Sequence, residues 1–348
     1  MNQMSDDAKA ILLLCGRLSK ASDCKPLPQH QYNKLAHWLH NHQLRPADLL
    51  QDGIVPRAAI GTGIAEQQLA ELLKRGVQLG FAVETWNRSG IWVNCRSDPD
   101  YPARYKQHLK DKAPPILFGA GNRSLLRGGG VAIVGSRNVD AQGEDFTRDV
   151  AAWCARGSMA VVSGGARGVD QIAMQSALDA GGHVIGVLAE NLLRKSVTRD
   201  ARQAIADDRL LLISPYHPEA RFTVGTAMGR NKLIYAMADC GLVVNAEYRK
   251  GGTWTGAEEE LKRRVARPIF VRTAGDVPIG NKKLLDLGAV AFPEEWRERA
   301  PAYVLNGLKK PRSPESDDLP LFSIQSTKKK DDEKGNVPKR IVHGSSSG

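Results

Sequence analysis

Short segments with an apolar centre alternate with helical segments along the chain from residue 130 to residue 295. The apolar segments are VAIVGS, MAVVSGG, HVIGVLA, LLLIS, GLVVNAE and PIFVRT. The segments between them include EDFTRDVAAWCARG, DQIAMQSALDAGG, NKLIYAMADC and AEEELKRRVA. Continuous apolar strands joined by helices indicate a parallel sheet that is covered on both faces. The pattern therefore predicts an α/β fold, a Rossmann-like doubly wound parallel sheet.

Residues 1–90 have apolar residues at helical spacing and predict a helical N-terminal domain. A first helix begins at Ser5 or Asp6, which can cap it. A second covers Tyr32 to Leu39, and a third runs without a break through EQQLAELLKRGVQLGF. The sheet domain, residues 91–295, opens with a short strand, IWVNC. A proline-punctuated connection with one brief helix, DPDYPARYKQHLKDKAPPILFGAGN, follows this strand.

Apolar residues become scarce after Trp296, and residues 296–348 are predicted to be a flexible, disordered basic tail. The segment DDLPLFS is an isolated apolar island within this tail. Its Leu319, Leu321 and Phe322 resemble the short peptide by which replication and repair proteins dock on the bacterial sliding clamp. The alternative is a small apolar patch that packs back on the core.

Composition narrows the class of partner. The chain has 348 residues, of which 42% are hydrophobic and 25% charged, as is typical of a globular protein with a sizeable core. Its formal net charge of +11 favours a nucleic acid over a neutral ligand, the alternative being a surface of solvated lysines. No apolar run is long enough to span a bilayer, and AILLLCGRL follows an acidic SDD, unlike a signal peptide. We therefore expect a cytoplasmic protein without a membrane partner.

The cysteines and histidines do not predict a metal site. The cysteines are scattered and odd in number, and Cys154 and Cys240 lie among apolar neighbours, as core residues do. The histidines of HWLHNH have no nearby carboxylate or cysteine partner, so a helix surface is the preferred interpretation. No metal and no cofactor is predicted.

The candidate binding residues follow the predicted strands. Because ligands bind at the carboxyl ends of the strands of a doubly wound sheet, the relevant segments are GSRN, SGGARGVD, AEN, SPYH, NAEYRKGGTWTGAEE and RTAG. Glycine turns at helix starts expose backbone N–H groups that attract phosphate. Arg137, Arg167 and Arg230 add guanidinium groups suited to phosphate oxygens. These segments predict one phosphate-binding edge; the alternative is that the glycines only make tight turns and the arginines are solvated.

Catalytic motifs are lacking. No glycine-lysine-serine/threonine ends a phosphate loop, and the further glycines of a dinucleotide fingerprint are absent after Gly135. Neither Ser136 nor Ser163 sits in a nucleophile elbow. Asp170 is best explained as a residue that caps or orients the following helix. We therefore predict binding without catalysis.

The order of five segments resembles the DprA/Smf family of DNA-processing proteins. They are DPDYPARYKQHLKDKAPPILFGAGN, VAIVGSR, SGGARGVDQIAMQSALDAGGHVIGVLAEN, GRNKLIYAMADCGLVVNAEYRKGGTWTGA and GNKKLLDLGA. The resemblance implies a Rossmann-like core that binds single-stranded DNA and has no established catalytic reaction. It also implies homodimers, a helical N-terminal domain, and help in loading the RecA recombinase during natural transformation or recombination, or in phage defence.

The resemblance and the strand ends point to the same residues. The predicted DNA- and phosphate-binding residues are Gly135, Ser136, Arg137, Ser163, Gly164, Gly165, Arg167, Gly168, Arg230, Asn231, Lys232, Gly251, Gly252, Thr253 and Thr255. The chain departs from the family pattern at Met174, where a histidine is usual, at Lys232, where arginine is usual, and at ENLLRKS, which replaces an aromatic and proline pattern. A C-terminal winged-helix domain is not recognisable.

Two alternatives to DNA binding stay open. The segment KGGTWTGAEE is similar to a loop of the lysine-decarboxylase-like phosphoribohydrolases, which cleave nucleoside monophosphates. In that family a glutamate helps catalysis, and Glu258 is the nearest candidate here. The other alternative is a nucleotide-sensing module of a stress or defence system.

Overall fold

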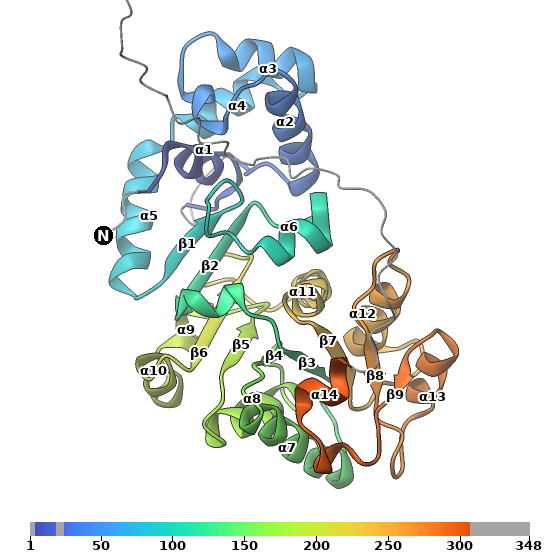
Figure 1. Ribbon diagram of the computed structural model, residues 1–348. Coiled ribbons are helices and arrows are strands. Elements are labelled where there is room, and N and C mark those ends of the chain that lie inside the picture. The colour runs from blue at the N-terminus through green and yellow to red at the C-terminus, as the bar shows by residue number, and fades with distance from the viewer. Residues whose placement is uncertain (1–3, 19–23, 307–348) are drawn as a thin grey trace, which may run out of the picture.

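A nine-stranded sheet forms the centre of the computed structural model, which describes residues 4–18 and 24–306 (Figure 1). In sheet order the strands are β1 (Trp92–Cys95), β2 (Ile116–Gly121), β6 (Leu210–Ser214), β5 (Val184–Val187), β4 (Val161–Ser163), β3 (Val131–Val134), β7 (Cys240–Val243), β8 (Ile269–Val271) and β9 (Val290–Ala291). All pairs from β6 to β9 are parallel. The predicted doubly wound α/β sheet is confirmed.

The strand β2 was not predicted, because its residues were assigned to a connection. It pairs antiparallel with β1 on one side and with β6 on the other. Its sequence, ILFGAG, holds two glycines and follows two prolines, which conceals the strand pattern. Gly119 is required there because a Cβ would lie 2.4 Å or less from the ring of Trp92 on β1. The strand therefore depends on contacts between segments distant in sequence.

Helices cover both faces of the sheet. After the five helices of the N-terminal region come α6 (Ala103–Leu109), α7 (Ala141–Arg156), α8 (Val169–Asp179), α9 (Leu192–Ser196), α10 (Arg199–Ala206), α11 (Val224–Met237), α12 (Gly251–Leu261), α13 (Ile279–Asp286) and α14 (Pro301–Asn306). Alternate side chains of β3 point to opposite faces of the sheet and belong to two different buried clusters. Val131 and Ile133 pack with apolar residues of α7 and α8, whereas Ala132 and Val134 belong to a second cluster with α11 and α12.

The N-terminal region contains α1 (Asp6–Cys15), α2 (Gln29–Asn41), α3 (Ile54–Thr62), α4 (Glu66–Leu73) and α5 (Gly76–Arg88). Ser5 caps α1 as predicted, since its Oγ accepts a hydrogen bond from the Ala8 N–H at 3.2 Å. The single third helix was wrong: the chain breaks between α4 and α5 at Arg75. The buried Arg75 guanidinium donates to the carbonyls of Leu13 and Gly16, so it satisfies the carbonyl end of α1.

The N-terminal helices lie beside β1 and β2 and share their core (Figure 1). Ile11 and Leu12 of α1 belong to the same buried cluster as Phe118 of β2. Apolar packing is thus continuous across residues 90 and 91. The domain boundary between these two residues remains a prediction.

Residues 296–306, assigned to the tail from sequence, are packed on the sheet domain. The 3-10 turn η4 (Trp296–Glu298) places Trp296 5.1 Å from Trp153, between ring centroids, and Trp153 Nε1 donates to the Arg299 carbonyl at 2.8 Å. The predicted end of order at residue 295 was thus too early. The rest of the predicted tail and its peptide, with Leu319, Leu321 and Phe322, lie outside the described residues.

Within residues 4–18 and 24–306, no helix has the length and apolar character needed to cross a membrane. The same ranges contain no cluster of histidine, cysteine and acidic residues that could hold a metal ion. Cys154 and Cys240 are buried, as predicted. His37, His40 and His42 are exposed on and at the end of α2, as predicted; His37 Nε2 lies 3.1 Å from Asp111 Oδ2 and His42 Nδ1 lies 2.8 Å from the Trp38 carbonyl oxygen.

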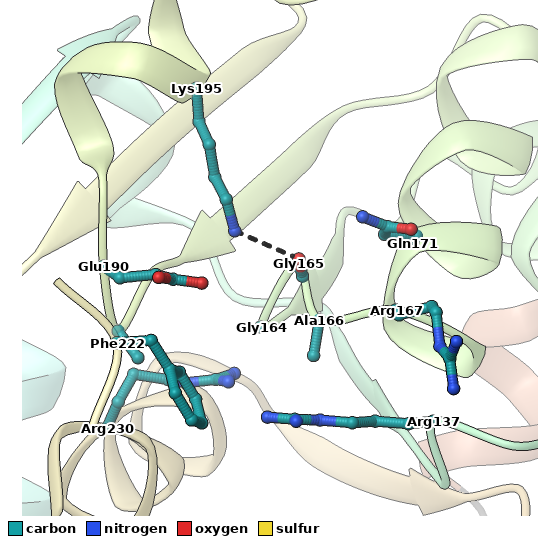
Figure 2. Close-up of a pocket in the computed structure, with 11 residues that line it drawn as sticks. Arg137, Gly164, Gly165, Ala166, Arg167, Gln171, Glu190, Lys195, Phe222 and Arg230 are labelled. Carbon is teal, nitrogen blue, oxygen red and sulfur yellow. Dashed lines mark hydrogen bonds between the residues drawn. The ribbon is translucent and has the colours of Figure 1, made fainter. Parts of the chain in front are cut away.

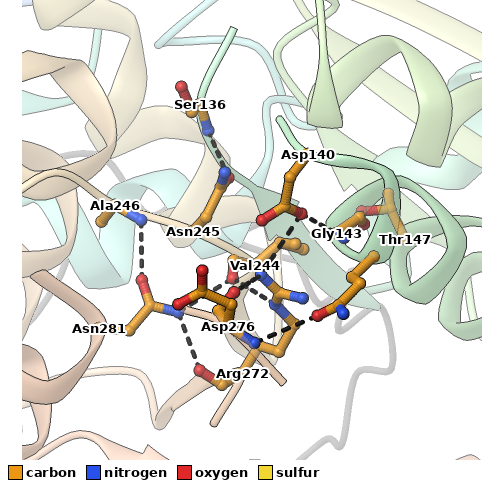
Figure 3. Close-up of polar contacts among 11 residues, drawn as sticks. Ser136, Asp140, Gly143, Thr147, Val244, Asn245, Ala246, Arg272, Asp276 and Asn281 are labelled. Carbon is orange, nitrogen blue, oxygen red and sulfur yellow. Dashed lines mark hydrogen bonds and ion pairs between the residues drawn. The ribbon is translucent and has the colours of Figure 1, made fainter. Parts of the chain in front are cut away.

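A buried polar network fixes the ends of β7 and β8 (Figure 3). The fully buried Asn281 of α13 donates to the carbonyls of Val244 and Arg272, both at 2.9 Å, and accepts from the Ala246 N–H at 2.8 Å. Arg272 is also buried; it donates to the Val244 carbonyl and lies 3.8 Å from Asp140, the N-cap of α7. The network holds the loop after β7 in one conformation.

We expect Asn281→Ala to lower the free energy of unfolding by about 3 kcal/mol, because each buried group left without a partner costs about 1–3 kcal/mol. Urea denaturation followed by circular dichroism measures the effect. The exposed neighbour Lys282 provides the control, and Lys282→Ala should change stability by less than about 0.5 kcal/mol. Equal transition midpoints for the two variants would contradict a stabilising role for the network.

Candidate functional site

The strand order places a crevice at the carboxyl end of β3. From β3 the chain proceeds to β4, β5 and β6 on one side, and then crosses back to β7 and β8 on the other side. The position beside β3 where the strand order reverses is the topological switch point of the sheet. The loops after the strands on its two sides run in opposite directions, which leaves an opening where ligands bind. The segments after β3, β4 and β7 meet here.

The turn after β3, Gly135–Arg137, is held by groups from β7 and α12. The Ser136 N–H donates to Asn245 Oδ1 at 2.9 Å, and Thr253 Oγ1 donates to the Gly135 carbonyl at 2.9 Å. Arg137 is exposed, and its guanidinium carbon lies 4.9 Å from the centre of the Phe222 ring. The turn is therefore fixed at its backbone while its arginine remains available to a ligand.

The turn after β4 packs against the turn after β3. Gly168 has φ 85°, and a Cβ there would lie 2.4 Å from the Ser136 carbonyl oxygen, so a side chain is excluded. The Val169 N–H donates to the same carbonyl at 3.3 Å, where α8 begins. Ser163 does not reach the crevice: it is fully buried, and its Oγ donates to the Ile133 carbonyl at 2.7 Å. Its role is to join β4 to β3.

Asp170 and Arg230 form a buried ion pair beneath the crevice. The Asp170 carboxylate accepts backbone hydrogen bonds from Gly135, Gly164 and Ala166, and lies 3.7 Å from Arg230 Nη1. Burial raises the pKa of Asp170 and lowers the pKa of Arg230, while their mutual attraction opposes both shifts. Asp170 thus holds the two turns that precede α8, whereas the sequence assigned it to the helix itself.

Arg230 keeps hydrogen-bonding capacity for a ligand. Its side chain is 6% exposed, and neither Nε nor Nη1 has a hydrogen-bond partner within the described part of the chain. The guanidinium lies directly on Gly164, where a Cβ would be 1.2 Å from Nη1. Nη1 is 3.7 Å from the Asp170 carboxylate, beyond hydrogen-bond distance. A buried guanidinium whose donors lack close acceptors is costly unless an acceptor binds, which makes this side chain a candidate anion ligand of the crevice.

Two adjoining cavities occupy the crevice, and both are lined by Arg137, Ala166, Phe222 and Arg230. The β5-side cavity, of about 430 Å³, is completed by Gly164, Gly165, Arg167, Gln171, Ala189, Glu190 and Lys195 (Figure 2). The β7-side cavity, of about 570 Å³, includes Gly135, Ser136, Asp170, Asn231, Asn245, Gly251, Gly252, Thr253 and Thr255. Both volumes are typical of small-ligand sites.

The N-terminal ends of α8 and α12 border these cavities. Gly251, at φ 76°, opens α12, and Asn231 Nδ2 donates to the Gly252 carbonyl at 3.0 Å. The first N–H groups of a helix have no partner within it and carry partial positive charge. At α8 the N–H groups of Val169, Gln171 and Ile172 already donate to backbone carbonyls of the two turns. The N-terminal end of α12, together with the three arginines, is therefore what makes the crevice suited to phosphate groups.

Most of the predicted residues line one of the two cavities, whereas Ser163, Gly168 and Lys232 line neither. Lys232 lies two residues after Arg230 on α11, and its charged neighbours are Glu259, Lys112 and Arg263. Burial lowers its pKa, and it lines neither cavity.

The lining residues that were not among the assigned binding residues include Glu190, Lys195, Phe222 and Asn245. Lys195 Nζ donates to the Gly165 carbonyl at 3.2 Å, and burial lowers its pKa. The signal that could have found Lys195 is the basic segment ENLLRKS directly after β5.

Comparison with known proteins identifies the family. Residues 92–295 match the family model described as DNA recombination-mediator protein A. The chain belongs to this family. The recombination-mediator match covers the whole sheet from β1 to β9, including every residue that lines the two cavities.

Curated relatives of the recombination-mediator family support the assignment. The chain is 31% identical over 183 residues to the putative DNA processing protein DprA of Mycobacterium tuberculosis, covering 51% of this chain and 46% of that protein. It is 31% identical over 191 residues to the protein Smf of Escherichia coli, covering 53% and 50%. The chain thus spans about half the length of the curated relatives it matches. DprA of Streptococcus pneumoniae has a similar fold, with a TM-score of 0.66 at 20% identity, covering 89% of this chain and 100% of that one.

We expect Gly164→Ala to lower the free energy of unfolding by about 1–3 kcal/mol, because its Cβ overlaps the Arg230 guanidinium. Gly80→Ala is the matched control. It lies within α5 with no atom within 4 Å of an added Cβ, and should raise stability by about 0.5–1 kcal/mol. Chemical denaturation of both variants checks the pair. If Gly164→Ala were as stable as the parent, Arg230 would not pack on this glycine.

Proposed function

We propose that this protein binds single-stranded DNA along the crevice at the ends of β3, β4 and β7, as a recombination mediator of the DprA type. The observation that carries the proposal is Arg230, a buried arginine with free donors, set between two helix N-termini and beside Arg137. Family membership and the net charge of +11 agree with it.

Two kinds of contact support a strand over a free phosphate. Arg137, Arg230 and the N-terminal end of α12 supply donors for successive phosphates. Phe222 is 41% exposed at the shared wall of the cavities, and its ring and the Arg137 guanidinium offer a surface for an unstacked base. A base in a duplex is already stacked and paired, so this second contact favours single strands.

We also propose a second copy of the chain, RecA and a sliding clamp as partners of the protein. A homodimer would join two crevices into a longer track, and RecA would receive the strand that the protein protects. The peptide with Leu319, Leu321 and Phe322 is proposed to contact a sliding clamp. The physiological setting is recombination or natural transformation, with phage defence as the alternative.

The residue that the phosphoribohydrolase alternative requires lies elsewhere. Glu258 lines neither cavity. Its Oε1 accepts from Lys262 at 2.8 Å and its Oε2 from Trp254 Nε1 at 3.1 Å, and these hydrogen bonds lower its pKa. A carboxylate held in this way stabilises α12 and does not face the crevice, so binding without catalysis is favoured.

We expect Arg137→Ala to weaken binding of a single-stranded oligonucleotide about tenfold, the loss of one charge-assisted contact. Fluorescence anisotropy over a salt series measures it, and the log–log salt slope should be smaller by about 0.7 in the variant. The exposed Arg88 of α5 supplies the control, since Arg88→Ala should leave the affinity unchanged. Equal affinities of Arg137→Ala and the parent would remove Arg137 from the site. Competition by a single mononucleotide at micromolar concentration would favour the sensing alternative.

We also expect no release of free base when the protein is incubated with AMP and the products are separated chromatographically. Glu258→Gln should bind single-stranded DNA like the parent, because the residue lies outside both cavities. Base release that Glu258→Gln abolishes would establish the phosphoribohydrolase activity instead.

A further inference from the structure

A carboxylate stands in the β5-side cavity, among cations. Glu190 lines this cavity together with Arg137, Arg167, Lys195 and Arg230. Figure 2 shows its side chain pointing into the space below Lys195 and toward the turn at Gly165. A site that bound only phosphate would be weakened by this charge, because a carboxylate repels a phosphate and accepts hydrogen bonds only. The position therefore calls for a ligand group that donates hydrogen bonds.

The loop after β5 fixes this carboxylate in place. The Asn191 N–H donates to the Ala220 carbonyl at 2.8 Å, which anchors the loop next to Glu190. Asn191 Nδ2 donates to Glu190 Oε2 at 3.2 Å. Among the described residues, Glu190 Oε1 has no hydrogen-bond donor, so one carboxylate oxygen and the spare lone pairs of the other are available.

Lys195 does not use the Glu190 carboxylate as a hydrogen-bond acceptor. Its Nζ donates to the Gly165 carbonyl, and the attraction between Lys195 and Glu190 is electrostatic without a hydrogen bond between them. A direct salt bridge would use the carboxylate oxygens, whereas this arrangement leaves them open to the cavity. The cations flanking Glu190 instead prevent its charge from excluding a polyanionic strand.

The four bases differ in what they offer to a carboxylate. Guanine presents two adjacent donors, N1–H and N2–H, on its Watson–Crick edge and can bind both oxygens. Cytosine and adenine each present one amino donor next to a ring-nitrogen acceptor, and thymine presents one donor between two carbonyl oxygens. In each of these three bases an acceptor would face a carboxylate oxygen and oppose binding. Single-stranded bases are commonly read on this edge while they stack on aromatic or guanidinium planes.

We infer that Glu190 recognises the Watson–Crick edge of a guanine base held in the β5-side cavity, with Phe222 and Arg137 as the adjacent stacking surface. The inference rests on the proposed function, since the base arrives as part of a bound strand. The protein then binds any single strand through its phosphates and binds most tightly where a guanine occupies the β5-side cavity.

The test uses an oligothymidine of about 12 nucleotides and variants in which one central residue is guanine, hypoxanthine, adenine or cytosine. A strand with one such base can slide until that base occupies the cavity. The guanine oligonucleotide should bind about tenfold more tightly than oligothymidine in fluorescence anisotropy, as expected for a bidentate contact. The hypoxanthine oligonucleotide should lie between them, because this base keeps N1–H and lacks the N2 amino group.

Glu190→Gln is the decisive variant, since the amide keeps the shape and replaces one acceptor with a donor. It should lose the preference for guanine, and any preference that remains should be for adenine or cytosine, whose Watson–Crick edges carry one donor next to one acceptor, as the amide does. Glu144→Gln is the matched control: Glu144 is an exposed residue of α7 paired with Arg148, and this variant should keep the guanine preference.

The outcomes separate this inference from the proposed function. If the parent binds no single-stranded DNA, the proposed function fails. If the parent binds all five oligonucleotides equally, or if Glu190→Gln changes every affinity by the same factor and keeps the order, the guanine inference fails while DNA binding stands. Glu190 would then act only on the electrostatics of Lys195.

Discussion

The buried pair of Asp170 and Arg230 is the interaction on which the crevice depends. Asp170 accepts hydrogen bonds from the backbone of two different turns, after β3 and after β4, and Arg230 reaches it from α11. Removing either partner would leave an uncompensated buried charge, which is far more costly than losing a surface ion pair. The pair therefore sets the positions of the backbone N–H groups of both turns and the position of the Arg230 guanidinium.

The glycines of the crevice follow from this arrangement. Gly164 has no side chain because the Arg230 guanidinium occupies the place of its Cβ, and Gly168 has none because the turn after β3 lies against it. The shape of each turn is therefore imposed by its neighbour. A dinucleotide fingerprint has glycines for a cofactor to approach, whereas here two of the glycines admit other parts of the protein.

The sheet and its ligand-binding edge could be predicted because parallel strands with apolar sequences end on a common side. Arg137 and Thr253 were assigned to the edge on this basis and Arg230 from the family resemblance, and the structure brings all three to one crevice. Lys232 was misplaced because residues two apart on a helix point in different directions. Ser163 was misplaced because the last residue of β4 faces the core, where its hydroxyl bonds β3.

The features that could not be predicted depend on contacts between segments that are distant in the sequence. The strand β2 is stabilised by β1 and β6, so its own residues carry little signal. Phe222 and Glu190 come from irregular loops, whose direction is set by contacts such as the Asn191–Ala220 hydrogen bond. The break at Arg75 arises because its side chain satisfies carbonyls of α1, far away in sequence.

The long sequence separation between Asp170 and Arg230 has a thermodynamic consequence. Their contact exists only when α11 has docked on the turns that precede and begin α8, so the crevice is complete only in the fully folded sheet. A ligand that binds Arg230 binds this state alone and shifts the folding equilibrium toward it by mass action. Occupancy of the crevice and integrity of the sheet are therefore linked, and each bound strand would act as a folding cofactor for the protein that holds it.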